Sequence, residues 1–150
     1  RSPRRSFSPS AQSAGPRVVR TRTDDPFEAL RDALEAKRSR RAVDLALQLG
    51  PDELRGLSVP QTIQLAHALN AADQWAASAH LLRRALADNQ TNSRALAEIY
   101  LALGLIRLEN GQQTAAQQHL LTALDLAPDT SVAERAREAL QKVSPGLRPN

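Results

Sequence analysis

The chain of 150 residues contains no cysteine, so disulfide bonds, thiolate zinc sites and cysteine nucleophiles are all excluded. It also has no run of about 18 apolar residues, the length that a membrane-spanning helix needs, so we expect no membrane span within it. Aromatic residues make up only 3%, with one Trp, one Tyr and two Phe. Ala and Leu dominate instead, which favours an all-α fold whose helices pack closely through small side chains.

Acidic residues are missing from the N-terminal part of the chain. The formal net charge is +4, yet residues 1–23 hold six Arg and no acid. Of the 20 basic residues 14 therefore remain against all 16 acids, which gives the rest of the chain a net charge of −2. Residues 1–24 are rich in Arg, Ser and Pro and have little apolar surface to offset the entropy of ordering, so we predict a disordered arm there.

Three roles for this arm stay open. It is a solvated linker, a juxtamembrane arm attracted to an anionic membrane surface, or a contact for nucleic acid phosphates. The second role fits the enrichment of Lys and Arg on the cytoplasmic flanks of membrane helices. The chain begins with Arg1 and not with Met, so we expect a fragment of a longer protein. We expect a cytoplasmic location, and a membrane tether in an upstream segment stays open as an alternative.

From Asp25 onward the sequence alternates between amphipathic helices and turn signals. Asp25, Pro26 and Glu28 predict a helix start, and the pair Ser58 and Gln61 predicts a capping box at another. Ser131 and Glu134 predict a capping box at the last helix. A short turn is expected over residues 51–57. The predicted helices cover residues 26–36, 41–49, 59–72, 75–87, 97–109 with an extension from about residue 92, 113–126 and 131–143.

The most strongly patterned stretch is 97–130, which predicts two helices folded back on each other. The first has apolar residues on nearly every side, so it is expected to be buried on more than one face. Gly111 ends it because glycine takes a left-handed conformation without steric cost. Pro128 closes the second helix, since proline cannot donate the next backbone hydrogen bond.

This stretch resembles a tetratricopeptide repeat. The signature positions of that family are present at Tyr100, Leu103, Gly104, Gly111, Ala116, Leu120, Ala123 and Pro128. Arg107 departs from the pattern, because the family usually has a Tyr there. The resemblance implies antiparallel helix-hairpin repeats that form a right-handed α-solenoid, here of about six or seven helices.

The resemblance also divides the chain. Setting Ala85 against Ala123 gives a repeat interval of 38 residues, about one helical turn beyond the usual 34. The extra turn is expected to lengthen the helix that begins near Asn92. The predicted parts are a degenerate pair over 25–50, a middle repeat over 59–92, the clearest repeat over 97–130, a capping helix over 131–143 and a flexible tail over 144–150.

Tetratricopeptide arrays bind peptides or helices on a concave surface lined by the first helix of each pair. Carried over to this chain, the lining residues are Ile63, His67, Asn70, Glu98, Leu101, Leu105 and Leu108. Such a groove is largely apolar and suits an amphipathic helix better than a C-terminal carboxylate. The alternative is that Leu101, Leu105 and Leu108 are covered by the chain's own first helix pair or by a second copy.

Candidate catalytic chemistry is sparse. The similar positions of His80 and His119 on successive hairpins would keep them too far apart for a shared zinc ion. Glu98 and Glu109 lie about 16 Å apart on one helix at 1.5 Å per residue, too far for a glycosidase pair. No Gly-rich phosphate loop or nucleophile elbow occurs.

We therefore predict no catalytic, cofactor or metal site and expect a protein-interaction scaffold. The alternatives are a cytoplasmic regulatory module of a membrane protein whose activity lies upstream, and nucleic acid binding through the arm.

Overall fold

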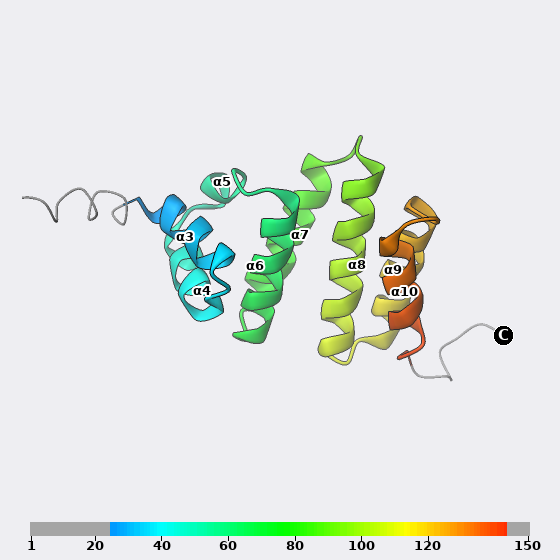
Figure 1. Ribbon diagram of the computed structural model, residues 1–150. Coiled ribbons are helices and arrows are strands. Elements are labelled where there is room, and N and C mark those ends of the chain that lie inside the picture. The colour runs from blue at the N-terminus through cyan, green and yellow to red at the C-terminus, as the bar shows by residue number, and fades with distance from the viewer. Residues whose placement is uncertain (1–24, 144–150) are drawn as a thin grey trace, which may run out of the picture. The chain divides into compact units, whose positions relative to one another are not determined.

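The computed structural model describes residues 25–143; the predicted arm (1–24) and tail (144–150) lie outside this range. The described residues form eight helices and no strand, and successive helices pack mostly antiparallel (Figure 1). This confirms the predicted all-α class, and the helix beyond the expected six or seven is a single short turn, α5. The chain divides into two compact units, with the boundary between Leu54 and Arg55.

The first unit contains α3 (Pro26–Glu35), α4 (Ser39–Gln48) and α5 (Pro51–Leu54). The carboxylate of Asp25 accepts hydrogen bonds from the backbone N–H groups of Phe27 and Glu28, which confirms the predicted cap. Helix α4 begins two residues earlier than predicted, because the preceding turn ends at Arg38, which itself is the N-cap. The buried faces of α3 and α4 carry Ala29, Leu30, Ala33, Leu34, Ala42, Val43, Leu45 and Ala46.

The second unit contains five helices in chain order. They are α6 (Val59–Ala71), α7 (Trp75–Asp88), α8 (Ser93–Glu109), α9 (Gln113–Leu126) and α10 (Ser131–Leu140). Helices α6 and α7 form one hairpin, α8 and α9 form another, and α10 packs on both α8 and α9 (Figure 1). Helix α8 also contacts α6 and α7, so its apolar residues are buried on more than one face, as the sequence predicts.

Side chains cap the first helix of each hairpin in this unit. At α6 the backbone N–H of Gln61 donates to Ser58 Oγ (3.2 Å), and the backbone N–H of Ser58 donates to Gln61 Oε1 (3.0 Å). This is the predicted capping box. The side chain of Asn92 caps α8, whose 17 residues include the predicted N-terminal extension.

The start of α10 differs from the prediction. Thr130, and not Ser131, is the N-cap: its Oγ1 accepts from the backbone N–H of Ala133 at 3.4 Å. Thr130 has an extended backbone (φ −128°, ψ 170°), which aims its hydroxyl at the first helical turn. Ser131 is already helical, and the helix ends at Leu140 instead of 143.

The turns inside the three hairpins share one geometry. A residue with positive φ follows the first helix: Lys37 (59°), Asp73 (63°) or Gly111 (77°). The next backbone N–H then donates to a carbonyl in the last turn of that helix, the hydrogen bond of a Schellman motif. These pairs are Arg38 to Ala33, Gln74 to Leu69 and Gln112 to Arg107, each at 2.8 Å. The donor residue is also the N-cap of the second helix, without a side-chain cap bond.

In each hairpin of the second unit, the two helices cross at small residues. A Cβ added to Gly104 on α8 would lie 2.6 Å from Leu120 Cδ2 and 3.3 Å from the carbonyl oxygen of Ala116. Only a hydrogen atom therefore fits there. At the crossing of α6 and α7, the buried hydroxyl of Ser78 donates to the carbonyl oxygen of Ala66 at 2.8 Å.

Candidate functional site

The leucine stripe of the predicted groove (Leu101, Leu105 and Leu108) is packed against the protein itself. Leu101 is only 2% exposed and belongs to the core, while Leu105 and Leu108 are partly buried and pack against that core. The cover comes from α9, from α10 and from Val143, three residues beyond the end of α10. The core cluster consists of Ala97, Leu101, Leu120, Ala123, Ala127, Val132, Ala136, Ala139 and Val143.

The remaining groove residues lie on α6 and α8. Ile63 and His67 are half-buried, and Asn70 is buried at 6% exposure. Glu98 is half-buried and pairs with Arg94 at 3.4 Å on the same helix. Of the seven predicted residues, Asn70 alone lines the pocket described next.

The residues carried over from the repeat signature lie largely together. Gly104, Ala116 and Leu120 meet at the crossing of α8 and α9, and Ala123 lies in the same buried core as Leu120. Tyr100 packs against this core, and its ring centroid lies 5.9 Å from that of His119. Leu103 is buried on another side of α8, and Pro128 is exposed beyond the end of α9.

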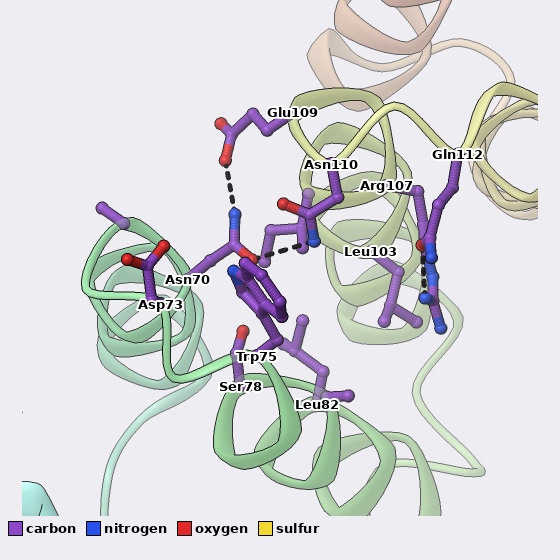
Figure 2. Close-up of a pocket in the computed structure, with 13 residues that line it drawn as sticks. Asn70, Asp73, Trp75, Ser78, Leu82, Leu103, Arg107, Glu109, Asn110 and Gln112 are labelled. Atoms are coloured by element: carbon purple, nitrogen blue, oxygen red, sulfur yellow. Dashed lines mark hydrogen bonds between the residues drawn. The ribbon is translucent and has the colours of Figure 1, made fainter.

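A pocket of about 560 Å³ opens where the end of α6, the start of α7 and the end of α8 come together (Figure 2). We call it the Trp75 pocket. Its buried apolar wall is formed by Leu82, Leu103 and Ile106. Its polar lining consists of Asn70, Asp73, Ser78, Arg107, Glu109, Asn110 and Gln112.

Trp75 is the first residue of α7 and the single tryptophan of the chain. It is 59% exposed, although it is the largest apolar side chain present. Figure 2 shows its indole among Asn70, Ser78 and Leu82, at the pocket. The turn through Asp73 and Gln74 places it there, because α7 starts directly after that turn.

Three polar side chains link the end of α6 to the end of α8. Asn70 Nδ2 donates to Glu109 Oε1 at 2.9 Å, and Asn110 Nδ2 donates to Asn70 Oδ1 at 3.0 Å (Figure 2). Both functions of the buried amide are therefore satisfied, as a buried polar group requires. The arrangement also fixes the carboxylate of Glu109 at the pocket.

His67 lies next to this network, with Nδ1 4.0 Å from Glu109 Oε2. Burial lowers the pKa of His67 below its ordinary value of 6.5; the negative charge of Glu109 partly opposes this effect, and Arg135 adds to it. Burial and Arg135 therefore disfavour the charged form of His67. The pKa of His119 is also lowered, by burial and then by Arg107.

The charges at the pocket are separated. Asp73 and Glu109 flank Asn70 in Figure 2, whereas Arg107 lies on the other side of the pocket and donates to Gln112 Oε1 at 2.6 Å. No lysine or arginine between residues 25 and 143 has a nitrogen within 4.0 Å of a carboxylate oxygen of Asp73 or Glu109. The pocket thus has an acidic side and a basic side.

The pocket holds no pair of groups arranged for nucleophilic catalysis. Its hydroxyl, on Ser78, is 1% exposed and donates to the backbone, not to a general base. In the range 25–143, no three His, Asp or Glu side chains are grouped so as to hold a metal ion. Among the helices described, none is both long and apolar enough to span a bilayer.

Sequence reasoning missed Trp75, Asn110 and Glu109 as members of one site. One signal was present: the 38-residue interval pairs Trp75 with Gln113, an ordinary polar residue at the start of α9. Trp75 is thus a large exposed aromatic residue at a position where its counterpart is polar.

No family model matches the chain, and no similar protein was found among curated proteins or solved structures. The fold and the pocket define an all-α protein of antiparallel helix hairpins with one aromatic, polar-rimmed cavity. The resemblance of residues 97–130 to a tetratricopeptide repeat rests on their sequence.

Proposed function

We propose that this chain is a helical-repeat interaction module, similar to tetratricopeptide arrays, that binds a peptide or helix of a partner protein and catalyses no reaction. The repeat is supported by equivalent residues at the two helix crossings. Ala66, Ser78 and Leu82 lie 38 residues before Gly104, Ala116 and Leu120. All six are buried, and each set places two small residues and a leucine where its helices meet.

The turns support the same proposal. Asp73 and Gly111 are also separated by 38 residues, have positive φ and precede the same backbone hydrogen bond. Lys37 occupies the corresponding place in the first hairpin. Repetition of one turn at a near-constant interval is expected when each hairpin is one unit of an array. A right-handed solenoid with α10 as its C-terminal cap is the architecture that we propose from this interval.

The exposed indole of Trp75 beside a concave pocket is the observation that carries the binding function. A tryptophan on a surface loses solvent contact at little entropic cost when a partner covers it, and such residues dominate the binding energy of many interfaces. The apolar wall behind it is buried and preformed. A peptide that covers Trp75 can therefore place one side chain against Leu82, Leu103 and Ile106.

The site differs from the groove expected from the family. With Leu101 in the core, the leucine stripe offers less free surface than the sequence indicated. We therefore place the peptide contact at the Trp75 pocket. The proposal includes a second copy of this chain as a partner that binds at the same pocket.

A photo-crosslinking amino acid at position 75 tests the proposal. A matched control carries it at Leu121, which is 41% exposed on α9 and does not line the pocket. We expect a defined protein to be crosslinked from position 75 and not from position 121. The purified partner should then bind the full chain about tenfold or more weakly after Trp75→Ala, and equally well after Leu121→Ala. Equal crosslinking from both positions, or equal affinity of both variants, would contradict the proposal.

Two alternatives depend on residues 1–24, which lie outside the described range. They are a module at the cytoplasmic face of a membrane and a nucleic acid contact through the arginine-rich arm. Titration with duplex DNA and with anionic vesicles at rising salt separates them from peptide binding. Deletion of residues 1–23 should remove both of these interactions and leave the contact at Trp75 unchanged.

A further inference from the structure

We infer that the Trp75 pocket binds the cationic side chain of an arginine or lysine in a partner's peptide segment. The inference rests on the proposed peptide-binding function and adds the chemistry of the ligand. Three features of the pocket carry it: two carboxylates that form no ion pair with a described lysine or arginine, an exposed indole beside them, and an Arg107 that is held on the opposite side.

The carboxylates of Asp73 and Glu109 form the acidic side. Asp73 is exposed on the turn between α6 and α7, and its backbone N–H donates to the carbonyl of Asn70 at 3.0 Å. The side chain of Glu109 is 54% exposed, and its Oε1 accepts from Asn70. Asn70 thus contacts both segments, with its backbone carbonyl at Asp73 and its side-chain amide at Glu109, and the two acids lie on either side of it in Figure 2.

No described lysine or arginine forms an ion pair with these two acids. The imidazole of His67 lies 4.0 Å from Glu109 Oε2, and burial together with Arg135 lowers the pKa of His67, which disfavours its charged form. Arg107 points to Gln112 on the other side of the pocket. Charge complementarity therefore favours a cation from outside the described chain.

The indole of Trp75 adds the second interaction. A guanidinium or ammonium group that approaches the carboxylates from the pocket mouth can also lie over the exposed ring, where the quadrupole of the indole attracts it. The methylene groups of the same side chain would contact the apolar wall. The pocket volume of about 560 Å³ accommodates such a long side chain.

The test uses two peptides that differ in one group. The probes are acetyl-Ala-Leu-Ala-Arg-Leu-Ala-amide and the same peptide with citrulline, which has the shape of arginine without its charge. Binding to the full chain is measured by calorimetry, and fluorescence of the single tryptophan reports whether the peptide reaches the pocket. We expect the arginine peptide to bind about tenfold more tightly than the citrulline peptide and to change the emission of Trp75.

Asp73→Asn with Glu109→Gln should abolish this preference. Asparagine tolerates a positive φ at position 73, and glutamine keeps an oxygen that can accept from Asn70, so the turn and the network are retained. The matched control is Glu134→Gln, which removes an exposed acid of α10 that does not line the pocket. It should leave the preference for arginine unchanged.

Two results would overturn the inference. In the first, both peptides bind with equal affinity and Trp75→Ala weakens both equally. The pocket would then bind peptides without regard to charge, so the inference would fail and the proposed function would stand. Binding of neither peptide at millimolar concentration would also reject a cation site. In that case crosslinking from position 75 decides separately whether a peptide of other chemistry binds there.

Discussion

Asn110 donates a 3.0 Å hydrogen bond to Asn70, joining the end of α8 to the end of α6. Asn70 is 6% exposed, whereas Asn110 lies on the surface. The amide of Asn70 therefore depends on its two partners from α8, while those partners keep access to water. The contact aligns two consecutive hairpins and forms part of the pocket lining.

This asymmetry predicts the result of a double-mutant cycle. Asn70→Ala should lower the free energy of unfolding by about 1–2 kcal/mol, and Asn110→Ala by less, because only the first removes both hydrogen bonds. The coupling between the two sites should be about 0.5–1.5 kcal/mol, measured by urea denaturation of all four proteins. Strict additivity would mean that this bond adds nothing to stability.

Substitution at the crossing of α8 and α9 should be costly. Gly104→Ala places a methyl group 2.6 Å from Leu120, so the two helices have to separate or Leu120 has to leave its rotamer. We expect a loss of about 1–3 kcal/mol, as for other overpacked cores, read from the urea midpoint. Gly50→Ala is the control, because the atom nearest to its added Cβ, Oε1 of Glu53, would lie 3.5 Å away, at ordinary van der Waals contact. A similar change in both variants would count against close packing as the cause.

At the left-handed turn positions, removing a glycine and introducing one should have opposite effects on stability. Gly111 has a φ of 77° with open space around its missing Cβ, so Gly111→Ala should cost about 1 kcal/mol through backbone strain alone. Lys37 holds φ 59° as a non-glycine residue, and Lys37→Gly should be neutral or stabilising. Thermal unfolding followed by circular dichroism measures both, and a strongly destabilising Lys37→Gly would argue against strain at this turn.

The two half-buried histidines predict a loss of stability in mild acid. Burial lowers the pKa of His67 and of His119 below 6.5 in the folded state, so the unfolded chain binds more protons as the pH falls. Their contribution to the free energy of unfolding is fully present above pH 6.5 and is lost as the pH falls through the folded-state pKa values. Urea denaturation at intervals between about pH 7.5 and 5.5 should show this decline.

The matched variant for the pH series is His67→Gln with His119→Gln. It should make the free energy of unfolding nearly independent of pH in this range, where Asp and Glu of ordinary pKa stay ionised. An unchanged slope in that variant would assign the decline to other groups.

Leu105→Glu distinguishes the core from the groove first expected there. Leu105 packs against the cluster that contains Leu101 and Val132, so a carboxylate at this position should destabilise the second unit by about 1–3 kcal/mol. Calorimetric unfolding gives the value. Leu121→Glu, at an exposed position of α9, serves as control and should change stability by less than about 0.5 kcal/mol. An unaltered melting curve of Leu105→Glu would return the leucine stripe to the candidate binding surfaces.

Local chemistry made much of this fold predictable. The box of Ser58 and Gln61 follows from neighbouring residues along the chain, and the extension of α8 from Asn92 was predicted from the 38-residue interval. Thr130 was missed as a cap because Thr130 and Ser131 are adjacent and both types of residue can cap a helix, so only the backbone angles decide between them. Lys37 and Asp73 were missed as left-handed residues because the sequence signal for that conformation is glycine.

The sequence by itself determined the all-α class, the position of the turn between α8 and α9, and the burial of α8 on more than one face. These features depend on periodicity and on caps, which act over a few residues. Tertiary structure alone decided what covers Leu101 and what surrounds Trp75. Those outcomes depend on which helix packs against which face. An apolar stripe predicts that a face is buried but does not predict which element covers it. The pocket arises from three segments that approach only after α6, α7 and α8 have packed, so the pattern of any one of them could not reveal it.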